Sequence, residues 1–312
     1  MTIQTDNTSA SAASPASLSS AESTPIEALS VVPVQQTPRF ATLPRVIARW
    51  TGLVLALLML ALILLWAVAP SWFTSEDPLL GVGADRLLPP SADHFFGTDQ
   101  FGRDVYTRVV YGAWLSVSGV VIAVVLSLVV GTFLGLIAGF VGGWLDDVIM
   151  RLGDVMLAIP AILLSMAVIT ALGGGTLEVA IAVGIASIAS IARTMRSEVL
   201  RVRTAGYVDA ARAGGVRWYS ILARHVLPNS RGPVIVLSTV EFGTALLAIA
   251  ALSFLGYGAT PPTPEWGAMI SEGRDFLATA WWLTTIPGLL VVLIVLSVNQ
   301  IAREVGTSRR FG

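Results

Sequence analysis

Long apolar stretches without charges recur along the chain and constrain its fold more than any other feature. The first covers residues 51–69 and ends at Pro70. About 20 apolar residues are enough for a helix to cross a bilayer, and a helix satisfies its own backbone polar groups where water is absent. We therefore predict an all-α polytopic membrane protein with about six membrane helices. The predicted spans are residues 51–69, 114–140, 148–172, 179–192, 233–252 and 281–302.

The basic residues predict how these spans are oriented. All nineteen are Arg, because the chain contains no Lys. With the N-terminus in the cytoplasm, fifteen of them fall in cytoplasmic segments, and reversing the topology would place those fifteen outside. Basic residues favour the cytoplasmic side of a membrane protein, so we expect both termini and the loop of residues 193–231 there. The four outer residues are Arg86, Arg103, Arg108 and Arg274.

Composition excludes several kinds of activity. The absence of Cys excludes disulfides and thiolate metal sites, and the two His residues, His94 and His225, lie too far apart in sequence to suggest a ligand cluster. Without Lys the chain cannot form a phosphate-binding P-loop, so it cannot hydrolyse nucleotide by that route. A membrane enzyme would need a clustered nucleophile, base or metal set, and we therefore disfavour that reading.

The N-terminal segment differs in composition from the rest. Residues 1–38 are rich in Ser, Ala, Thr and Pro and contain no apolar run. Such a segment cannot bury enough apolar surface to order itself. We expect a disordered cytoplasmic tail, not a secretory signal, followed by one transmembrane domain over residues 39–312.

The loop of residues 193–231 is too polar to insert into the membrane and is expected to form a helical hairpin. Residues 205–213 favour a helix, which Gly214 and Gly215 end. Residues 216–226 can resume the helix until Pro228 stops it. The eight Arg residues of this loop would equally suit a segment that only grips anionic lipid head groups, and composition leaves both readings open.

Two features inside the spans predict how the helices pack. Gly131, Gly135, Gly139 and Gly143 recur every four residues and form a smooth stripe that lets another backbone approach closely. We favour packing against a neighbouring span over a seam between subunits. Pro160 predicts a kink in the third span.

The cytoplasmic loop also carries a sequence motif. Asp209-Ala210-Ala211, then Gly215, then His225-Val226-Leu227-Pro228 resembles the EAA signature of ABC importer permeases, which reads E-A-A-x3-G-x9-I-x-L-P. The chain departs from that signature by Asp209 in place of Glu and by His225 in place of Ile.

Further motifs resemble those of one subfamily. The segments Phe96–Arg108, Leu252–Gly258 and Pro261–Gly267 are similar to the G-T-D-x-x-G-R-D, L-S-F-L-G-x-G and P-P-x-P-E-W-G stretches of the C-type permease subunit in dipeptide and oligopeptide importers. The resemblance covers about residues 45–300. It implies the transmembrane domain of a type I ABC importer, multi-pass in the bacterial plasma membrane.

This resemblance also implies a function and a set of partners. The chain would be a non-catalytic subunit that forms half of a pathway for dipeptides or short oligopeptides. Two ATPase subunits would bind ATP and Mg²⁺, a second permease would complete a heterodimer, and an extracytoplasmic binding protein would deliver substrate. Membrane lipid would surround the chain, and no nucleic acid, cofactor or metal is expected. Alternative cargoes are nickel, glutathione or haem, and the less favoured alternative mechanism is an ATP-independent secondary transporter.

The same resemblance assigns candidate residues. The candidates for docking to an ATPase subunit are eight residues of the cytoplasmic loop: Tyr207, Asp209, Ala210, Ala211, Gly214, Gly215, Leu227 and Pro228. Candidates for the pathway or an outer gate are Glu241, an acid deep in a span, together with Phe254 and Gly256. Candidates for contacts with the binding protein or within the outer loops are Asp99, Arg103, Asp104, Arg108, Glu265 and Trp266. For the first four of these, internal ion pairs at helical spacing are the alternative that we favour.

Overall fold

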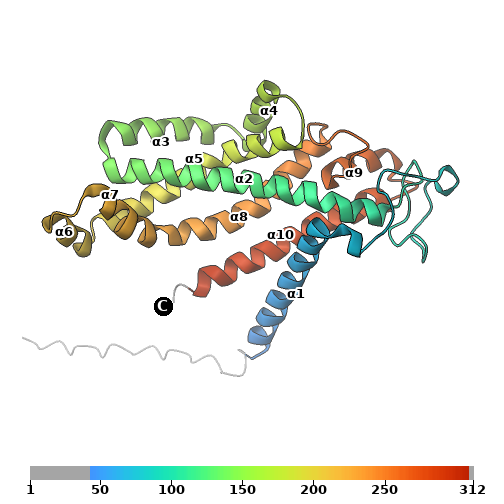
Figure 1. Cartoon of the computed structure of the whole chain (residues 1–312), viewed down its shortest axis with the longest axis horizontal. Helices are drawn as coiled ribbons and strands as arrows, with labels where there is room; N and C mark the ends of the chain where they lie inside the picture. Colours follow the sequence, from blue (N-terminus) through green and yellow to red (C-terminus); the bar gives the residue numbers. More distant parts are fainter. Residues whose placement is uncertain (1–42, 309–312) are drawn as a thin grey trace, which may run out of the picture. The chain divides into compact units, whose positions relative to one another are not determined.

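A computed structural model of the chain describes the backbone of residues 43–308 and the side chains of residues 50–304. The regular secondary structure of the described part is helical, apart from one isolated bridge between Thr98 and Asp104 (Figure 1). The tail predicted for residues 1–38 lies outside the described residues. Described residues from Pro44 onward belong to one compact unit.

Five helices of this unit are long and apolar enough to cross a membrane. They are α1 (Leu43–Val68), α2 (Val105–Val141), α5 (Thr176–Arg203), α8 (Leu227–Phe254) and α10 (Trp282–Ser308). A bent pair, α3 (Gly143–Ala158) and α4 (Ala161–Leu172), makes a sixth span if the two helices count together.

The packing of α2 against α5 shows that this bent pair crosses the membrane. Gly139 near the end of α2 lies against Val199 near the end of α5, and Gly119 lies near Ala180 at the other end. The two helices therefore run parallel, and the end of α2 and the start of α5 lie on opposite sides of the membrane. Since α3 and α4 connect the end of α2 to the start of α5, they carry the chain across the same thickness. The described chain crosses six times.

The break between α3 and α4 is sharper than the kink that Pro160 predicted. The two helices meet at 101°. Ile159, the residue before the proline, is extended, with φ −95° and ψ 130°, because a following proline disfavours the helical region. Pro160 is extended as well, with ψ 130°, and α4 begins directly after it. Two successive residues outside the helical region produce a corner where one proline alone would only bend the helix.

The glycine stripe packs within the subunit, as we favoured, but over three of its four members. A Cβ atom on Gly135 would lie 2.2 Å from the carbonyl oxygen of Ala192 in α5. A Cβ atom on Gly131 would lie 2.7 Å from a side-chain atom of α5, and a Cβ atom on Gly139 would lie 2.8 Å from another. Gly143 was wrongly included, because it lies past the end of α2 with open space around it. The stripe sets the close approach of α2 and α5.

Helices α2 and α5 extend beyond the predicted spans because charged residues continue the helices past the apolar stretches. Helix α2 begins at Val105 instead of residue 114, since the Asp104 side chain accepts a hydrogen bond of 2.7 Å from the Thr107 amide and caps the helix. Helix α5 continues past Ala192 to Arg203. Apolar length locates the membrane-embedded part of a helix, and capping decides where the helix itself begins.

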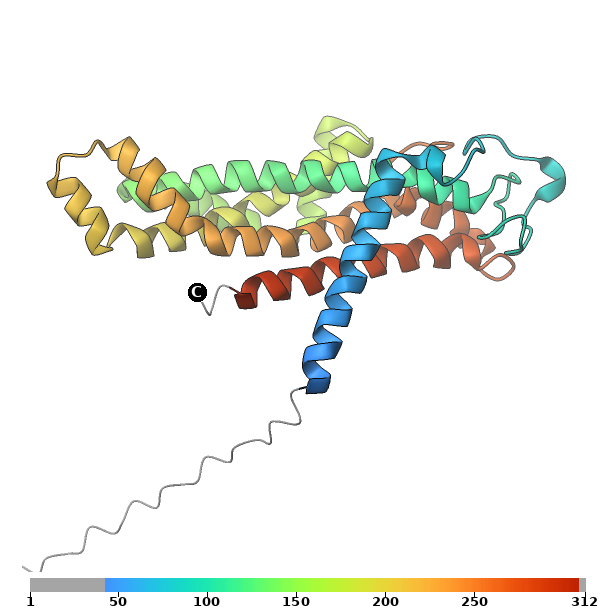
Figure 2. The ribbon, with the colours of Figure 1, turned by 60° about the horizontal axis from the view of Figure 1, so that its bottom comes forward.

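Helix α1 crosses α10 at a steep angle (Figures 1 and 2). Its outer half packs into the core through Ile63 and Trp66, which are buried. Gly52, in its inner half, lies close to the side chain of Gln300 in α10. Many of the remaining apolar side chains of α1 are exposed, which suits a helix at the edge of a membrane bundle.

The glycine packing generates a stability prediction. Gly135→Ala places a methyl group against a backbone carbonyl that cannot move aside, so we expect it to lower the stability of the detergent-solubilised protein by about 1–3 kcal/mol. Gly83→Ala is the matched control, since a Cβ there meets nothing within 4 Å. Thermal unfolding of both variants is the measurement. Equal unfolding temperatures for the two would contradict the packing.

Candidate functional site

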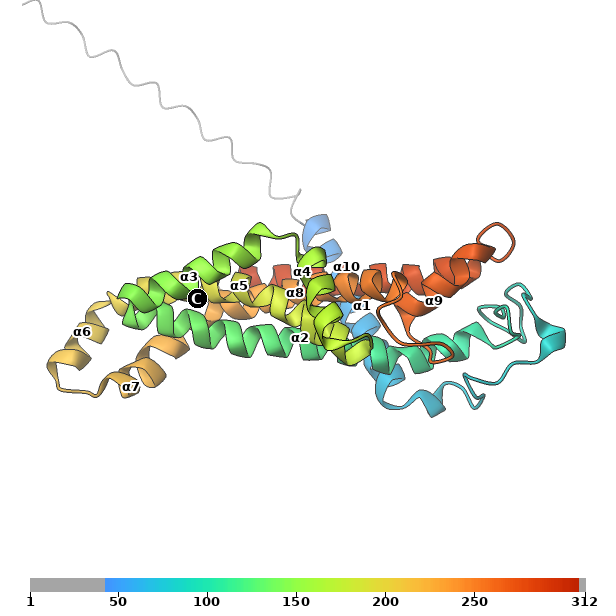
Figure 3. The ribbon, with the colours of Figure 1, turned by 90° about the horizontal axis from the view of Figure 1, so that it is seen from above.

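A helical hairpin projects from the cytoplasmic end of α5 and α8. It consists of α6 (Gly206–Ala213), a turn, and α7 (Trp218–Ile221), and it lies at the end of the bundle opposite the loop of residues 70–104 (Figures 1 and 3). Helix α6 matches the helix expected over residues 205–213. The orientation predicted from the Arg residues places this end in the cytoplasm.

The turn of the hairpin depends on glycine. Gly215 has a φ of +76°, a left-handed conformation that side chains with a Cβ rarely adopt. Its amide donates to the carbonyl of Arg212 at 3.0 Å, and the amide of Val216 donates to the carbonyl of Ala211 at 3.1 Å. These bonds satisfy the last carbonyls of α6 and fix the turn.

The prediction that Pro228 ends the second helix of the hairpin was wrong. From Trp218 the chain continues through α7 and a π-helical turn (Leu222–Val226) directly into α8, so one helical segment runs to Phe254. Pro228 lies in the first turn of α8. The wider π turn accommodates the missing amide and the ring of the proline. The hairpin is therefore continuous with a membrane span and is not hinged at the proline.

A small apolar cluster fastens the hairpin to the bundle. Val208 of α6, Ile221 of α7 and Val226 of the π turn are almost completely buried. They pack together with Val199 and Val202 of α5. A Leu or Val buried in this way contributes about 1.5–3 kcal/mol. Displacement of α6 would therefore be transmitted to α5 and α8.

The structure divides the eight predicted docking residues into two groups. Leu227 and Ala211 pack against the apolar cluster and are half-buried. The remaining residues face outward. They are Tyr207, Asp209, Ala210, Gly214, Gly215 and Pro228.

Two aromatic residues that we did not predict extend this outward surface. Trp218 is 63% exposed and Tyr219 is 49% exposed. Their rings lie edge to face at 5.9 Å, and Phe140 at the end of α2 lies 6.5 Å from Trp218. Exposed aromatic side chains on a projecting element are typical anchors of protein interfaces. The signal in the sequence was an adjacent Trp-Tyr pair within the polar loop.

Asp209 is available to a partner. Its only ion pair among the described residues is with Arg212 at 3.5 Å, and both side chains are largely exposed. Such a pair contributes roughly 0–1 kcal/mol to stability. A basic residue of another protein can therefore replace Arg212 as the partner of Asp209 at little cost.

Arg residues of α5 connect it to its neighbours at the same end. Arg196 donates two hydrogen bonds, of 2.5 Å and 2.6 Å, to Asp146 of α3. Arg203 donates to the carbonyl of Gly139 in α2 at 2.7 Å. A bidentate Arg–carboxylate pair fixes orientation as well as distance. Helix α5, which carries the hairpin, is thus fixed to two of its neighbours, α2 and α3.

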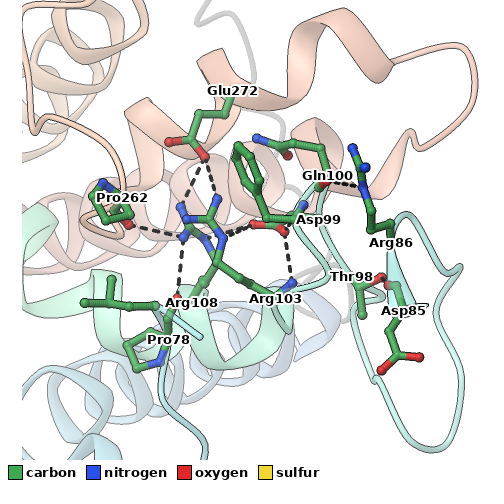
Figure 4. A network of polar contacts seen from close by, with 12 residues as sticks. Pro78, Asp85, Arg86, Thr98, Asp99, Gln100, Arg103, Arg108, Pro262 and Glu272 are labelled. Carbon is green, nitrogen blue, oxygen red and sulfur yellow. Dashed lines mark hydrogen bonds and ion pairs between the residues drawn. The ribbon is translucent and has the colours of Figure 1, made fainter. Parts of the chain in front are cut away.

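The outer end holds a buried network of charges (Figure 4). Asp99 accepts a hydrogen bond of 2.6 Å from Arg103 and lies 3.6 Å from Arg108. Both Arg residues reach Glu272 of α9 (Trp266–Gly273), at 3.4 Å and 3.2 Å. Arg108 also donates to the carbonyl of Pro262 at 3.2 Å. The network ties the start of α2 to the loop before α9 and to α9 itself.

This burial favours internal ion pairs over contacts with a binding protein. Asp99, Arg103 and Arg108 are at most 4% exposed, so in this conformation a second protein cannot reach them. Asp104 serves as the cap of α2 and lies 3.1 Å from Nδ1 of His94.

Glu265 and Trp266 are likewise internal. Glu265 accepts hydrogen bonds from the amides of Gly267 and Ala268, at 3.0 Å and 2.8 Å, and so caps α9. The Trp266 indole donates to the carbonyl of Val109 in α2 at 3.0 Å. Burial raises the pKa of the Glu265 carboxyl above its ordinary value, against the opposing effect of its hydrogen bonds. Both residues hold the outer loop together.

The three predicted pathway residues lie in different places, and the contacts within the described part of the chain do not bring them together. Glu241 lies within α8 and contacts a hydroxyl of α5. Phe254 is the last residue of α8 and is half-buried, while Gly256 follows it in a left-handed conformation with φ +92°.

Comparison with known proteins gives consistent matches. The family model described as the inner membrane component of binding-protein-dependent transport systems matches residues 131–308. The dipeptide transport system permease protein DppC of Alkalihalophilus pseudofirmus is 43% identical over 248 residues, which cover 80% of this chain and 82% of that protein. The glutathione transport system permease protein GsiD of Shigella flexneri is 43% identical over 245 residues, which cover 78% and 81%.

Solved structures share the fold. An inward-facing structure of the MetNI methionine ABC transporter matches with a TM-score of 0.50 at 18% identity, covering 64% of this chain and 96% of that one. An amino acid ABC transporter crystallised with histidines matches with a TM-score of 0.51 at 15% identity, covering 66% and 95%. These likenesses agree with the predicted transmembrane fold of a type I importer.

The buried cap at Glu265 generates a prediction. Glu265→Ala leaves two buried amides without an acceptor, so we expect a loss of about 1–3 kcal/mol in stability, whereas Glu76→Ala on the exposed outer loop should cost less than about 0.5 kcal/mol. Because folding raises the pKa of Glu265, the unfolded chain loses its proton first as the pH rises. The extra stability of the wild type over Glu265→Ala should therefore shrink as the pH rises from the ordinary pKa of 4.5 towards the raised pKa of the folded protein. Thermal unfolding at several pH values measures both effects, and a wild-type advantage that grows over this interval would contradict the raised pKa.

Proposed function

Because the chain belongs to the family of inner membrane components of binding-protein-dependent transport systems, we propose that it is the C-type permease subunit of an ATP-driven importer of dipeptides or short oligopeptides. It forms half of the translocation pathway and hydrolyses nothing itself. The observation that carries this proposal is the hairpin of α6 and α7, which presents the residues of the EAA-like motif on a rigid projection.

The partners follow from this assignment. Two ATPase subunits bind ATP and Mg²⁺ and close on the hairpin from the cytoplasm. A second, homologous permease completes the pathway, and a binding protein delivers the substrate from outside. Support comes from the family description, which names dependence on a binding protein, and from the absence of Lys, which leaves this chain without a P-loop.

A short peptide is the cargo that the relatives support best. One relative is named for dipeptides and another, from Brucella suis, for peptides. A third is named for glutathione, itself a tripeptide, which makes glutathione the second candidate. Uptake of both cargoes by the reconstituted complex distinguishes them.

The hairpin surface suits a groove on an ATPase. Ala210, Gly214 and Gly215 have little or no side chain, so a partner backbone can approach them closely. Asp209 supplies a carboxylate for a basic residue of the partner. Trp218 and Tyr219 add apolar area beside these small residues, as aromatic anchors do in protein interfaces.

Gly215 tests docking directly. Gly215→Trp places a bulky side chain in the open space beside the turn and strains its left-handed backbone, so we expect uptake to fall at least about tenfold, as for the loss of an interface hot spot, while the protein remains in the membrane. Gly215→Asn is the control, since Asn tolerates the left-handed backbone and adds little bulk. Peptide uptake and ATPase activity in proteoliposomes are the measurements. Uptake by Gly215→Trp at the wild-type rate would contradict the assignment of Gly215 to the docking surface.

Trp218 tests the aromatic part of the surface. Trp218→Ala should weaken binding of the ATPase subunits by about 2 kcal/mol, or roughly thirtyfold. Trp144→Ala is the matched control, because Trp144 is 75% exposed at the start of α3 and lies outside the hairpin. Titration of the purified permease pair with ATPase subunits measures both. Equal losses for the two variants would show that the effect is not specific to the hairpin.

A further inference from the structure

A line of hydroxyl side chains follows one face of α5. Ser187, Ser190, Thr194 and Ser197 are spaced by three, four and three residues, which places them on one side of a helix. The first three are half-buried and the last is exposed. We call these four residues the hydroxyl track. It begins about 16 Å from the outer end of α5 and continues to its cytoplasmic part.

A carboxylate lies beside the start of the track. One carboxylate oxygen of Glu241 in α8 accepts a hydrogen bond of 3.2 Å from Ser187. Thr244 shares its proton between the same oxygen, at 3.1 Å, and the main-chain carbonyl of Glu241, at 3.0 Å. Glu241 stands thirteen residues before the end of α8, or about 20 Å from the outer end. This depth lies within the hydrocarbon region, which is about 30 Å thick.

Within the described part of the chain, Glu241 forms no ion pair. The other acids of the cytoplasmic half that contact α5 have Arg partners, namely Asp146 with Arg196 and Asp154 with Arg193. A carboxylate at membrane depth costs several kcal/mol unless it meets a cation or water. Glu241 is half-buried and Thr244 is exposed, so the carboxylate lies at the open side of the α5–α8 pair and not in the core.

The hydroxyl groups near Glu241 use their protons inside the protein. Ser187 and Thr244 donate to Glu241, Thr194 donates to the carbonyl of Ser190 at 3.1 Å, and Ser197 donates to the carbonyl of Thr194 at 2.8 Å. A hydroxyl has one proton and two acceptor positions. The oxygens of these hydroxyl groups can therefore still accept hydrogen bonds from a bound molecule. An acceptor-lined surface that starts at a carboxylate favours a passenger that is rich in N–H groups and positively charged.

We propose, resting on the proposed import of peptides, that Glu241 binds the α-ammonium group of the passing peptide and that the hydroxyl track accepts its N–H groups on the way to the cytoplasm. Lipid cannot occupy this face without leaving the carboxylate uncompensated. A second permease subunit seated on the same face is the competing occupant. Thr244 and Ser187 position the Glu241 carboxylate.

The test compares two cargoes in proteoliposomes that contain the complete complex with its binding protein. One is a peptide with a free amino terminus, and the other is the same peptide with that terminus acetylated. Glu241→Gln should lower the uptake rate of the free peptide about tenfold, the effect of losing a charge-assisted hydrogen bond, and leave the rate for the acetylated peptide unchanged. Glu241→Asp, which retains the charge, should recover part of the selectivity.

Control variants separate the track from general damage. Thr194→Val on the track should slow both peptides, whereas Thr239→Val, on a face of α8 that lines a groove with α1 and α10, should slow neither. Co-purification of the second permease is measured for every variant. Equal loss of both peptides in Glu241→Gln, or loss of the second permease from the complex, would overturn the proposal. If the wild-type complex imports neither peptide, the proposed function fails instead.

Discussion

The close contact between α2 and α5 is the interaction on which the rest of the structure depends. Glycine at positions 131, 135 and 139 lets the two backbones approach until a Cβ would overlap a carbonyl oxygen. Lipid supplies no hydrophobic driving force between helices, so such packing must stabilise the bundle. Helix α5 then emerges in a fixed direction and carries the hydroxyl track, the Arg contacts and the hairpin along its length. Its position decides where force enters and where a peptide would pass.

The two ends of the bundle use polar groups in different ways. At the outer end, buried charges and caps hold the loops to α2 and α9, with Glu272 and Asp99 bridging two Arg residues. At the cytoplasmic end, polar and aromatic side chains face outward, while a few Val and Ile residues anchor the hairpin from within. A rigid outer cap and an exposed inner projection suit a subunit that is moved from one side of the membrane.

Much of this architecture could be predicted from the sequence because the membrane imposes simple rules. Apolar length located the spans, Arg placement predicted their direction, and the Gly214-Gly215 pair located the turn of the hairpin. The errors arose where a local hydrogen bond or backbone conformation decides whether a helix begins, breaks or continues. The cap at Asp104 lengthened α2, two extended residues at Pro160 made a corner, and a π turn allowed the helix to continue through Pro228. Glu265 accepts a hydrogen bond from Ser116 and Trp266 donates one to Val109, and both partners lie in α2, more than 140 residues away in the chain, so no local pattern reveals this burial.

The central claim is that an exposed cytoplasmic hairpin receives the motion of a separate ATPase. Because the chain has no Cys, an Ala210→Cys variant carries a single reactive thiol on α6. A membrane-impermeant maleimide should label this thiol in inside-out vesicles and not in right-side-out vesicles, and bound ATPase subunits should protect it. Labelling from the outer side, or labelling in inside-out vesicles that the ATPase subunits do not reduce, would contradict the account.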